Sequence, residues 1–238
     1  MNKLAIFVEG QTEQIFVERL LNAIAGENNI KIESSKRFAQ FSALKLASEQ
    51  TPGQERYYVQ IYDSSNDSKV VSDVRDHYDR LVASGYQAII GIRDVYPTQR
   101  EDISKLRIGC ISQLKSKPIK VCFILAVMEI EAWFLAEFTH FERIDPRLSM
   151  EYIGNNLGFD PQTDDMSIRL KPSDDLHNIY QLVNKAYHKS KKQVQGTVKA
   201  LDYAHLYLEL ISKIEGLSRL IDEIDHFLGL PKALLPTD

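Results

Sequence analysis

The chain contains few cysteines and no long apolar stretch. Its 238 residues include two cysteines, Cys110 and Cys122, which are too few for a disulfide scaffold. No segment approaches the roughly 20 consecutive apolar residues that span a bilayer. The N-terminus shows no basic region, signal-like apolar segment or cleavage site. We therefore expect a cytoplasmic protein with no membrane segment.

Several well-known catalytic motifs are also missing. The sequence has no Walker loop, no GxSxG elbow and no GxGxxG turn. His177 and His188 do not have a spacing typical of zinc sites. The net charge of −4 argues against indiscriminate nucleic-acid binding. P-loop, α/β-hydrolase and dinucleotide-binding signatures are thus absent from the sequence.

Three continuous apolar runs each end in acidic residues. They are residues 4–8 followed by Glu9, residues 88–92 followed by Asp94, and residues 121–127 followed by Glu129 and Glu131. Runs of this kind are typical of strands buried on both faces of a parallel sheet. Ligands gather at the carboxyl ends of such strands, and converging carboxylates repel one another unless a cation or proton lies between them. The pattern predicts a divalent-metal site whose oxygen ligands suit Mg²⁺ or Mn²⁺.

Strand and helix patterns alternate over the first part of the chain, and helical patterns fill the rest. Predicted strands cover residues 4–8, 30–32, 57–62, 87–92 and 119–127, and predicted helices cover 12–25, about 41–48, 70–82 and 99–115. This order favours an α/β fold with a mainly parallel sheet. From about residue 174 onward the apolar spacing is helical. We expect an α/β domain over 1–140 and a mostly helical C-terminal extension over 141–238.

Each acidic residue also has a simpler interpretation. Glu13 lies in the first turn of the predicted helix 12–25, where a carboxylate complements the helix dipole, so that role competes with a metal role. Asp94 suits a turn before Pro97. Glu131 would lie in an apolar stripe if 128–138 is a helix, and it then needs a metal, an arginine or a catalytic role. Glu129 would point about 200° away on that helix. It would reach the same ion only if the strand persists through it.

A basic segment lies in the second half of the chain. Residues 169–199 contain seven Lys or Arg against two Asp, a charge of +5 in a chain of −4. Lysines beside a helix N-terminus are able to bind a phosphate group. The competing interpretation is a lysine-rich loop that is simply exposed to solvent. The residues expected to hold a nucleic-acid backbone are Lys171, Lys189, Lys191 and Lys192.

The segment Val8-Glu9-Gly10-Gln11-Thr12-Glu13, with Glu131-Ala132-Trp133 later in the chain, resembles TOPRIM-like proteins. These are the metal-dependent domains of topoisomerases, primases and OLD-type nucleases, and the similarity is closest to small stand-alone RloB-like proteins of bacterial phage defence. The resemblance covers about residues 1–140. It implies a TOPRIM-like, Rossmann-like sheet and Mg²⁺- or Mn²⁺-dependent cleavage of DNA or RNA.

The resemblance also implies residue roles. Glu9 would be the general base or a metal ligand, Asp94 a ligand of the first ion, Glu13 a ligand of the second, and Glu131 a supporting acid. Where the TOPRIM pattern has an Asp-x-Asp pair, this chain has Asp94-Val95-Tyr96. Either Glu129 or Glu131 substitutes for the missing acid, or the site binds one ion, or catalysis has been lost.

The functional expectation follows from that resemblance. We expect a nuclease of anti-phage defence, with Glu9, Asp94 and Glu131 as its catalytic residues. The alternative is a non-catalytic module on a degenerate TOPRIM scaffold that binds nucleic acid or a partner. A third reading is a core subunit of a defence complex, with an ATPase or another subunit as its partner.

Overall fold

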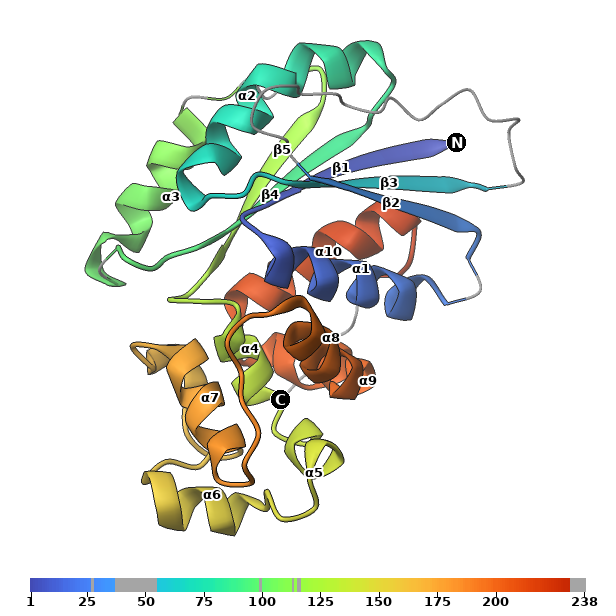
Figure 1. Ribbon diagram of the computed structural model, residues 1–238. Coiled ribbons are helices and arrows are strands. Elements are labelled where there is room, and N and C mark those ends of the chain that lie inside the picture. The colour runs from blue at the N-terminus through green and yellow to red at the C-terminus, as the bar shows by residue number, and fades with distance from the viewer. Residues whose placement is uncertain (27, 37–54, 99, 113, 115–116, 232–238) are drawn as a thin grey trace. The chain divides into compact units, whose positions relative to one another are not determined.

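The computed structural model describes residues 1–26, 28–36, 55–98, 100–112, 114 and 117–231 (Figure 1). Its strands are β1 (Asn2–Val8), β2 (Ile30–Lys36), β3 (Tyr57–Asp63), β4 (Ala88–Asp94) and β5 (Lys120–Ala126). They form one five-stranded, all-parallel sheet in the order β2-β3-β1-β4-β5. Val8 at the end of the central strand pairs with Asp63 on one side and Ile92 on the other. The α/β class and the parallel sheet expected from the apolar runs are confirmed.

Helices flank the sheet and make up the rest of the described chain. They are α1 (Gln11–Ala25), α2 (Asp67–Ala83), α3 (Ile103–Ser112), α4 (Glu131–Ala136), α5 (His140–Ile144), α6 (Met150–Leu157), α7 (Pro172–Gln181), α8 (Lys191–Ala200), α9 (Tyr203–Leu208) and α10 (Glu215–Leu228), with 3-10 turns at Arg100–Asp102, Met166–Ile168 and Leu210–Ser212. No strand follows Ala126 in the described residues, as the predicted helical extension requires. No described helix is both long enough and apolar enough to cross a membrane. The predicted helix at about 41–48 lies outside the described residues.

Two compact units divide the chain. Among the described residues, unit 1 comprises those of Met1–Arg93, Asp102–Leu125 and Glu223–Pro231, and unit 2 comprises those of Asp94–Glu101 and Ala126–Asp222. Both units are assembled from separated stretches of sequence. The predicted domain boundary at residue 140 stays a prediction.

In unit 1 the helices cover both faces of the sheet. Figure 1 shows α2 and α3 on one face, and α1 with the end of α10 on the other. The first face carries a core that includes Phe7, Val74 and Phe123, each at most 1% exposed. On the other face, the hydroxyl of Tyr57 donates to the carbonyl of Leu228, 2.6 Å away, and so ties the last helical turn to the sheet.

A glycine in the middle of β4 permits close packing inside this core. A Cβ added at Gly91 would lie 2.5 Å from Cε1 of Phe123, far inside van der Waals contact. Glycine weakens a strand interior, so its presence marks a place where another group approaches the backbone. The Phe123 ring therefore fills the space that any other residue at position 91 would need.

Candidate functional site

The acidic residues after β5 come together because no helix forms directly after the strand. The strand ends at Ala126, and Met128 adopts a left-handed backbone with φ of 61°. The helix α4 starts only at Glu131. The separation of about 200° between Glu129 and Glu131 applies only if 128–138 is a continuous helix, and the backbone does not form one there. The sharp turn places both carboxylates against the same lysine.

Lys189 joins these two glutamates. Its Nζ lies 3.1 Å from Oε1 of Glu129 and 3.1 Å from Oε1 of Glu131. The Glu131 side chain is fully buried, whereas that of Lys189 is 39% exposed. Lys189 has a φ of 55°, a conformation that residues other than glycine seldom adopt. Strained residues persist where the surrounding structure holds them, and they gather at functional sites.

Neighbouring donors fix the orientation of both carboxylates. The hydroxyl of Tyr187 donates to Oε1 of Glu131 at 2.9 Å. The backbone N–H and the hydroxyl of Ser173 donate to Glu129 at 2.8 and 3.0 Å. Because Ser173 lies in the first turn of α7, Glu129 satisfies one of the N–H groups that every helix start leaves unpaired.

Asp94, at the end of β4, lies beside the same segment. It is 7% exposed, and its Oδ1 accepts from the backbone N–H of Ile130 at 3.0 Å. Ile130 stands between Glu129 and Glu131 in the sequence, so unit 2 holds three carboxylates around one ammonium group. We call Asp94, Glu129, Glu131 and Lys189 the acidic cluster.

Burial and charge shift the pKa values in the acidic cluster in opposite directions. Burial raises the pKa of Glu131; Lys189 lowers it without cancelling that effect, and the charge of Glu129 adds to the rise. Burial also acts on Glu129, but Lys189 and Ser173 outweigh it and lower its pKa. Burial alone would lower the pKa of Lys189, yet the charges of Glu131 and Glu129 raise it. Lys189 therefore stays charged, and of the two glutamates Glu131 protonates more readily.

The predicted ligands in unit 1 have their own surroundings. Glu9 is half-buried directly after β1. Glu13 is 5% exposed, and its Oε2 accepts from the N–H of Gly10 at 2.9 Å, which caps the start of α1. This is the helix-terminus role that competed with metal binding in the sequence. The metal roles of Glu9 and Glu13 stay predictions.

The predicted nucleic-acid lysines differ in their contacts. Lys189 binds the glutamates as described. Lys171 is 66% exposed on its side chain, and its Nζ lies 3.7 Å from Asp174. Lys191 and Lys192 are exposed in the first turn of α8. Within the described ranges, no three His, Cys, Asp or Glu side chains are arranged as a metal site, so the metal also stays a prediction.

The sequence analysis did not identify a second group of buried polar side chains, around Glu137. Glu137, fully buried after α4, accepts from the N–H of Asp202 at 3.0 Å and lies 3.1 Å from Nδ1 of His205. His140 is also fully buried, and burial lowers its pKa to about 4. Glu137 lies in the apolar segment 132–141, so the argument made for Glu131 applied to it as well.

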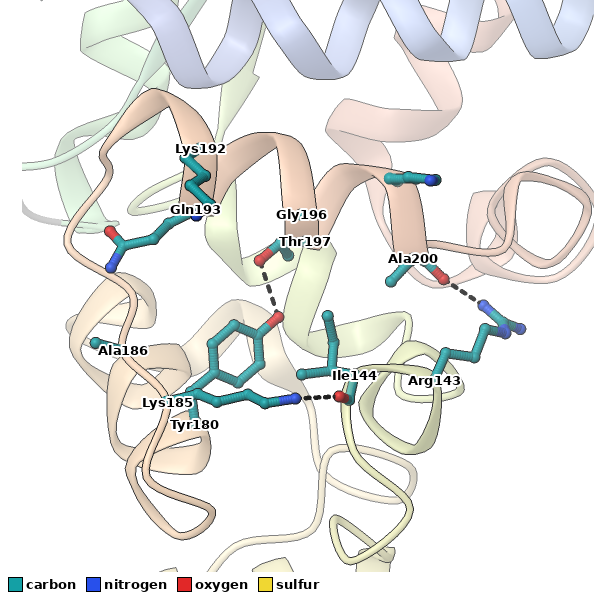
Figure 2. Close-up of a pocket in the computed structure, with 11 residues that line it drawn as sticks. Arg143, Ile144, Tyr180, Lys185, Ala186, Lys192, Gln193, Gly196, Thr197 and Ala200 are labelled. Atoms are coloured by element: carbon teal, nitrogen blue, oxygen red, sulfur yellow. Dashed lines mark hydrogen bonds between the residues drawn. The ribbon is translucent and has the colours of Figure 1, made fainter.

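Unit 2 also contains a cavity of about 720 Å³ beside α8 (Figure 2). One wall is the helix α8, and the facing wall is formed by α5, the end of α7 and the segment after it. Its basic lining residues are Arg143, Lys185, Lys192 and Lys199. Of these, only Lys192 was singled out from the sequence; Arg143 and Lys185 lie on other segments, and Lys199 lies further along α8.

Comparisons with known proteins place the chain in a family. No curated protein and no solved structure matches it. A family model described as "Domain of unknown function (DUF4276)" matches residues 8–205. That range contains Glu9, Glu13, the whole acidic cluster and every residue that lines the cavity. Because the match covers most of the sequence, this chain belongs to the DUF4276 family.

Proposed function

We propose that this protein carries out divalent-metal-dependent phosphodiester chemistry on DNA or RNA, on a TOPRIM-like scaffold. The acidic cluster carries the proposal. It gathers Asp94, Glu129 and Glu131 from the ends of two neighbouring strands around the single ammonium of Lys189. A buried ion pair contributes little net stability, and buried charged groups with shifted pKa values mark candidate functional sites.

The charge of the cluster suits a divalent cation. With all three carboxylates ionised and Lys189 protonated, the four side chains carry a net charge of −2. Carboxylate oxygens are the ligands that Mg²⁺ and Mn²⁺ prefer. A bound metal of this kind polarises the phosphate, activates the attacking water and neutralises the leaving oxygen.

The protein's own residues would position the substrate. The ammonium of Lys189 is held by two carboxylates while 39% of the side chain is exposed, so the group can donate to a phosphate oxygen while it stays charged. Tyr187 and Ser173 keep the two glutamates in place. By the resemblance, Glu9 acts as general base or metal ligand. It directly follows β1, one of the two strands at which the strand order reverses, where α/β sheets bind ligands.

The proposed setting rests on the resemblance to TOPRIM-like proteins. We place the protein in the cytoplasm, in anti-phage defence, with an ATPase or another defence subunit as a partner. The similarity of the VEGxTE segment to stand-alone defence nucleases supports this setting.

A second candidate function is a non-catalytic nucleic-acid- or partner-binding module. The observation in its favour is Lys189 itself, which already neutralises part of the charge of Glu129 and Glu131. In addition, the segment Asp94-Val95-Tyr96 lacks a second acidic residue. Such a module would bind nucleic acid without metal, with an affinity that falls steeply as salt rises.

One set of measurements distinguishes the two functions. Mn²⁺ and Mg²⁺ binding is measured by calorimetry, and cleavage of labelled single- and double-stranded DNA and RNA is followed with each metal. We expect Glu131→Gln and Glu9→Gln to abolish metal-dependent cleavage, and the exposed Glu209→Gln to retain it. Undiminished cleavage by Glu131→Gln would refute the mechanism. Salt-sensitive nucleic-acid binding with no metal binding at millimolar concentration would establish the second function.

A further inference from the structure

The cavity beside α8 has an unusual distribution of charge. Four basic side chains line it, and in the described part of the chain no acidic residue does. In an acidic protein with a net charge of −4, a cavity whose charged lining residues are all basic requires an explanation. Such surfaces concentrate anions.

Two of the four basic side chains are held in place by the protein. Arg143 donates to the carbonyl of Ala200 at 2.6 Å and lies 3.0 Å from a carboxylate oxygen of Asp202. Lys185 donates to the carbonyl of Ile144, as Figure 2 shows, and lies 3.6 Å from Asp145. These contacts fix the two groups at the edge of the cavity and neutralise much of their charge.

Lys192 and Lys199 have the opposite character. Across the described ranges, neither side chain makes a hydrogen bond or an ion pair, and both are exposed. They lie seven residues apart on α8, so they share one face of that helix. The cavity therefore offers two ammonium groups that no carboxylate of the described residues neutralises. Their total charge of +2 would balance the charge of about −2 on a phosphate monoester dianion.

Gly196 lies between these lysines on the same face of α8. A glycine inside a helix is less stable than alanine, so its presence there needs a reason. Its backbone is not in the positive-φ region, and an added Cβ would meet nothing within 4 Å. No part of the described protein requires a glycine here. The residue leaves the backbone of α8 open to the cavity, where a ligand can approach it closely.

The rest of the lining is largely apolar. Ile144, Ala186 and Ala200 border the cavity, together with Tyr180, whose hydroxyl is bound to Thr197 at 2.9 Å (Figure 2). Because Tyr180 is 4% exposed and its hydroxyl is satisfied, it forms a rigid floor. A ligand that fits this lining has an anionic end and a flat, less polar body.

We propose that the cavity binds the phosphomonoester of a nucleotide. Lys192 and Lys199 hold the phosphate over Gly196, and the base lies against Ile144 and Ala186. The phosphomonoester has two sources, a free mononucleotide or the phosphorylated end of a nucleic-acid strand. The proposal is independent of the metal chemistry, because the lining contains none of the acidic residues proposed for it.

The test measures binding by calorimetry at low salt with EDTA present, so that metal chemistry plays no part. The probes are adenosine 5′-monophosphate, adenosine, and one short oligonucleotide with and without a 5′-phosphate. We expect a phosphorylated probe to bind at least about tenfold more tightly than its unphosphorylated counterpart. Tight binding of the mononucleotide identifies the free nucleotide as the source, and tight binding of the phosphorylated oligonucleotide alone identifies the strand end.

Three variants test the placement. Lys192→Met/Lys199→Met is expected to lose at least about tenfold in affinity, and Gly196→Ala also weakens binding although alanine favours the helix. The matched control is Lys213→Met, since this exposed lysine does not line the cavity. Equal binding of phosphorylated and unphosphorylated probes would overturn the proposal, as would equal losses in the control and the double variant.

Discussion

Replacement of Lys189 by methionine gives the sharpest test of the acidic cluster. The change leaves Glu131 fully buried beside Glu129 without the ammonium group that pairs with both. Removal of one partner from a buried ion pair costs about 3–5 kcal/mol. Since 39% of the Lys189 side chain is exposed, water screens part of the interaction. We therefore expect the free energy of unfolding to fall by about 2–3 kcal/mol at neutral pH.

The loss should shrink as the pH is lowered. In the variant, burial and the charge of Glu129 raise the pKa of Glu131 unopposed by Lys189. A carboxyl whose pKa is higher in the folded state stabilises the fold as the pH falls toward its unfolded value. In the wild type, Glu129 has a lowered pKa and loses its contribution only below its unfolded value, so it adds no difference between pH 7.5 and pH 5. The two proteins should thus differ more at pH 7.5 than at pH 5.

Urea denaturation followed by the fluorescence of Trp133 measures this effect. Trp133 is the single tryptophan of the chain and is 1% exposed in unit 2, two residues from Glu131. Lys171→Met is the matched control, because the pair of Lys171 with Asp174 is exposed and contributes at most about 1 kcal/mol. The double variant Lys189→Met/Glu131→Gln should recover most of the loss. A deficit that is no larger than in the control, or that is equal at both pH values, would refute the ion-pair arrangement.

Three further changes probe other parts of the chain. Gly91→Ala is expected to destabilise the fold by about 1–3 kcal/mol, because its Cβ would collide with the Phe123 ring. Thermal denaturation measures this loss, and the double variant Gly91→Ala/Phe123→Leu should recover part of it. A single variant as stable as the wild type would contradict the close packing. Glu13→Ala removes the acceptor of the Gly10 N–H and should cost about 0.5–2 kcal/mol by the same assay, with a smaller loss in Glu13→Gln. Burial lowers the pKa of His140 from 6.5 to about 4, so the wild type should lose stability as the pH falls through that window, since the unfolded chain binds the proton first. In His140→Gln this acid dependence should weaken in urea titrations, and an unchanged slope would exclude His140 as its source.

The local sequence predicts much of the sheet. Apolar runs such as residues 4–8 and 121–127 are too continuous for a surface strand, and both became buried, parallel strands. The strand order was not predictable, because it depends on which strands pair across long separations in the chain. The backbone between β5 and α4 was also left open by the sequence. Apolar spacing allowed either a helix from residue 128 or a strand through Glu129, and the left-handed backbone of Met128 instead separates the strand from a helix that starts at Glu131.

The sequence by itself determined that Glu131 needs a partner, since a carboxylate within an apolar stripe cannot be buried alone. Only the tertiary structure decided which group meets Glu131. Lys189 lies 58 residues away, and the folding of the intervening helices brings it there. Likewise, α8 becomes the wall of a basic cavity only when Arg143 and Lys185 pack opposite it, through contacts that no local pattern encodes.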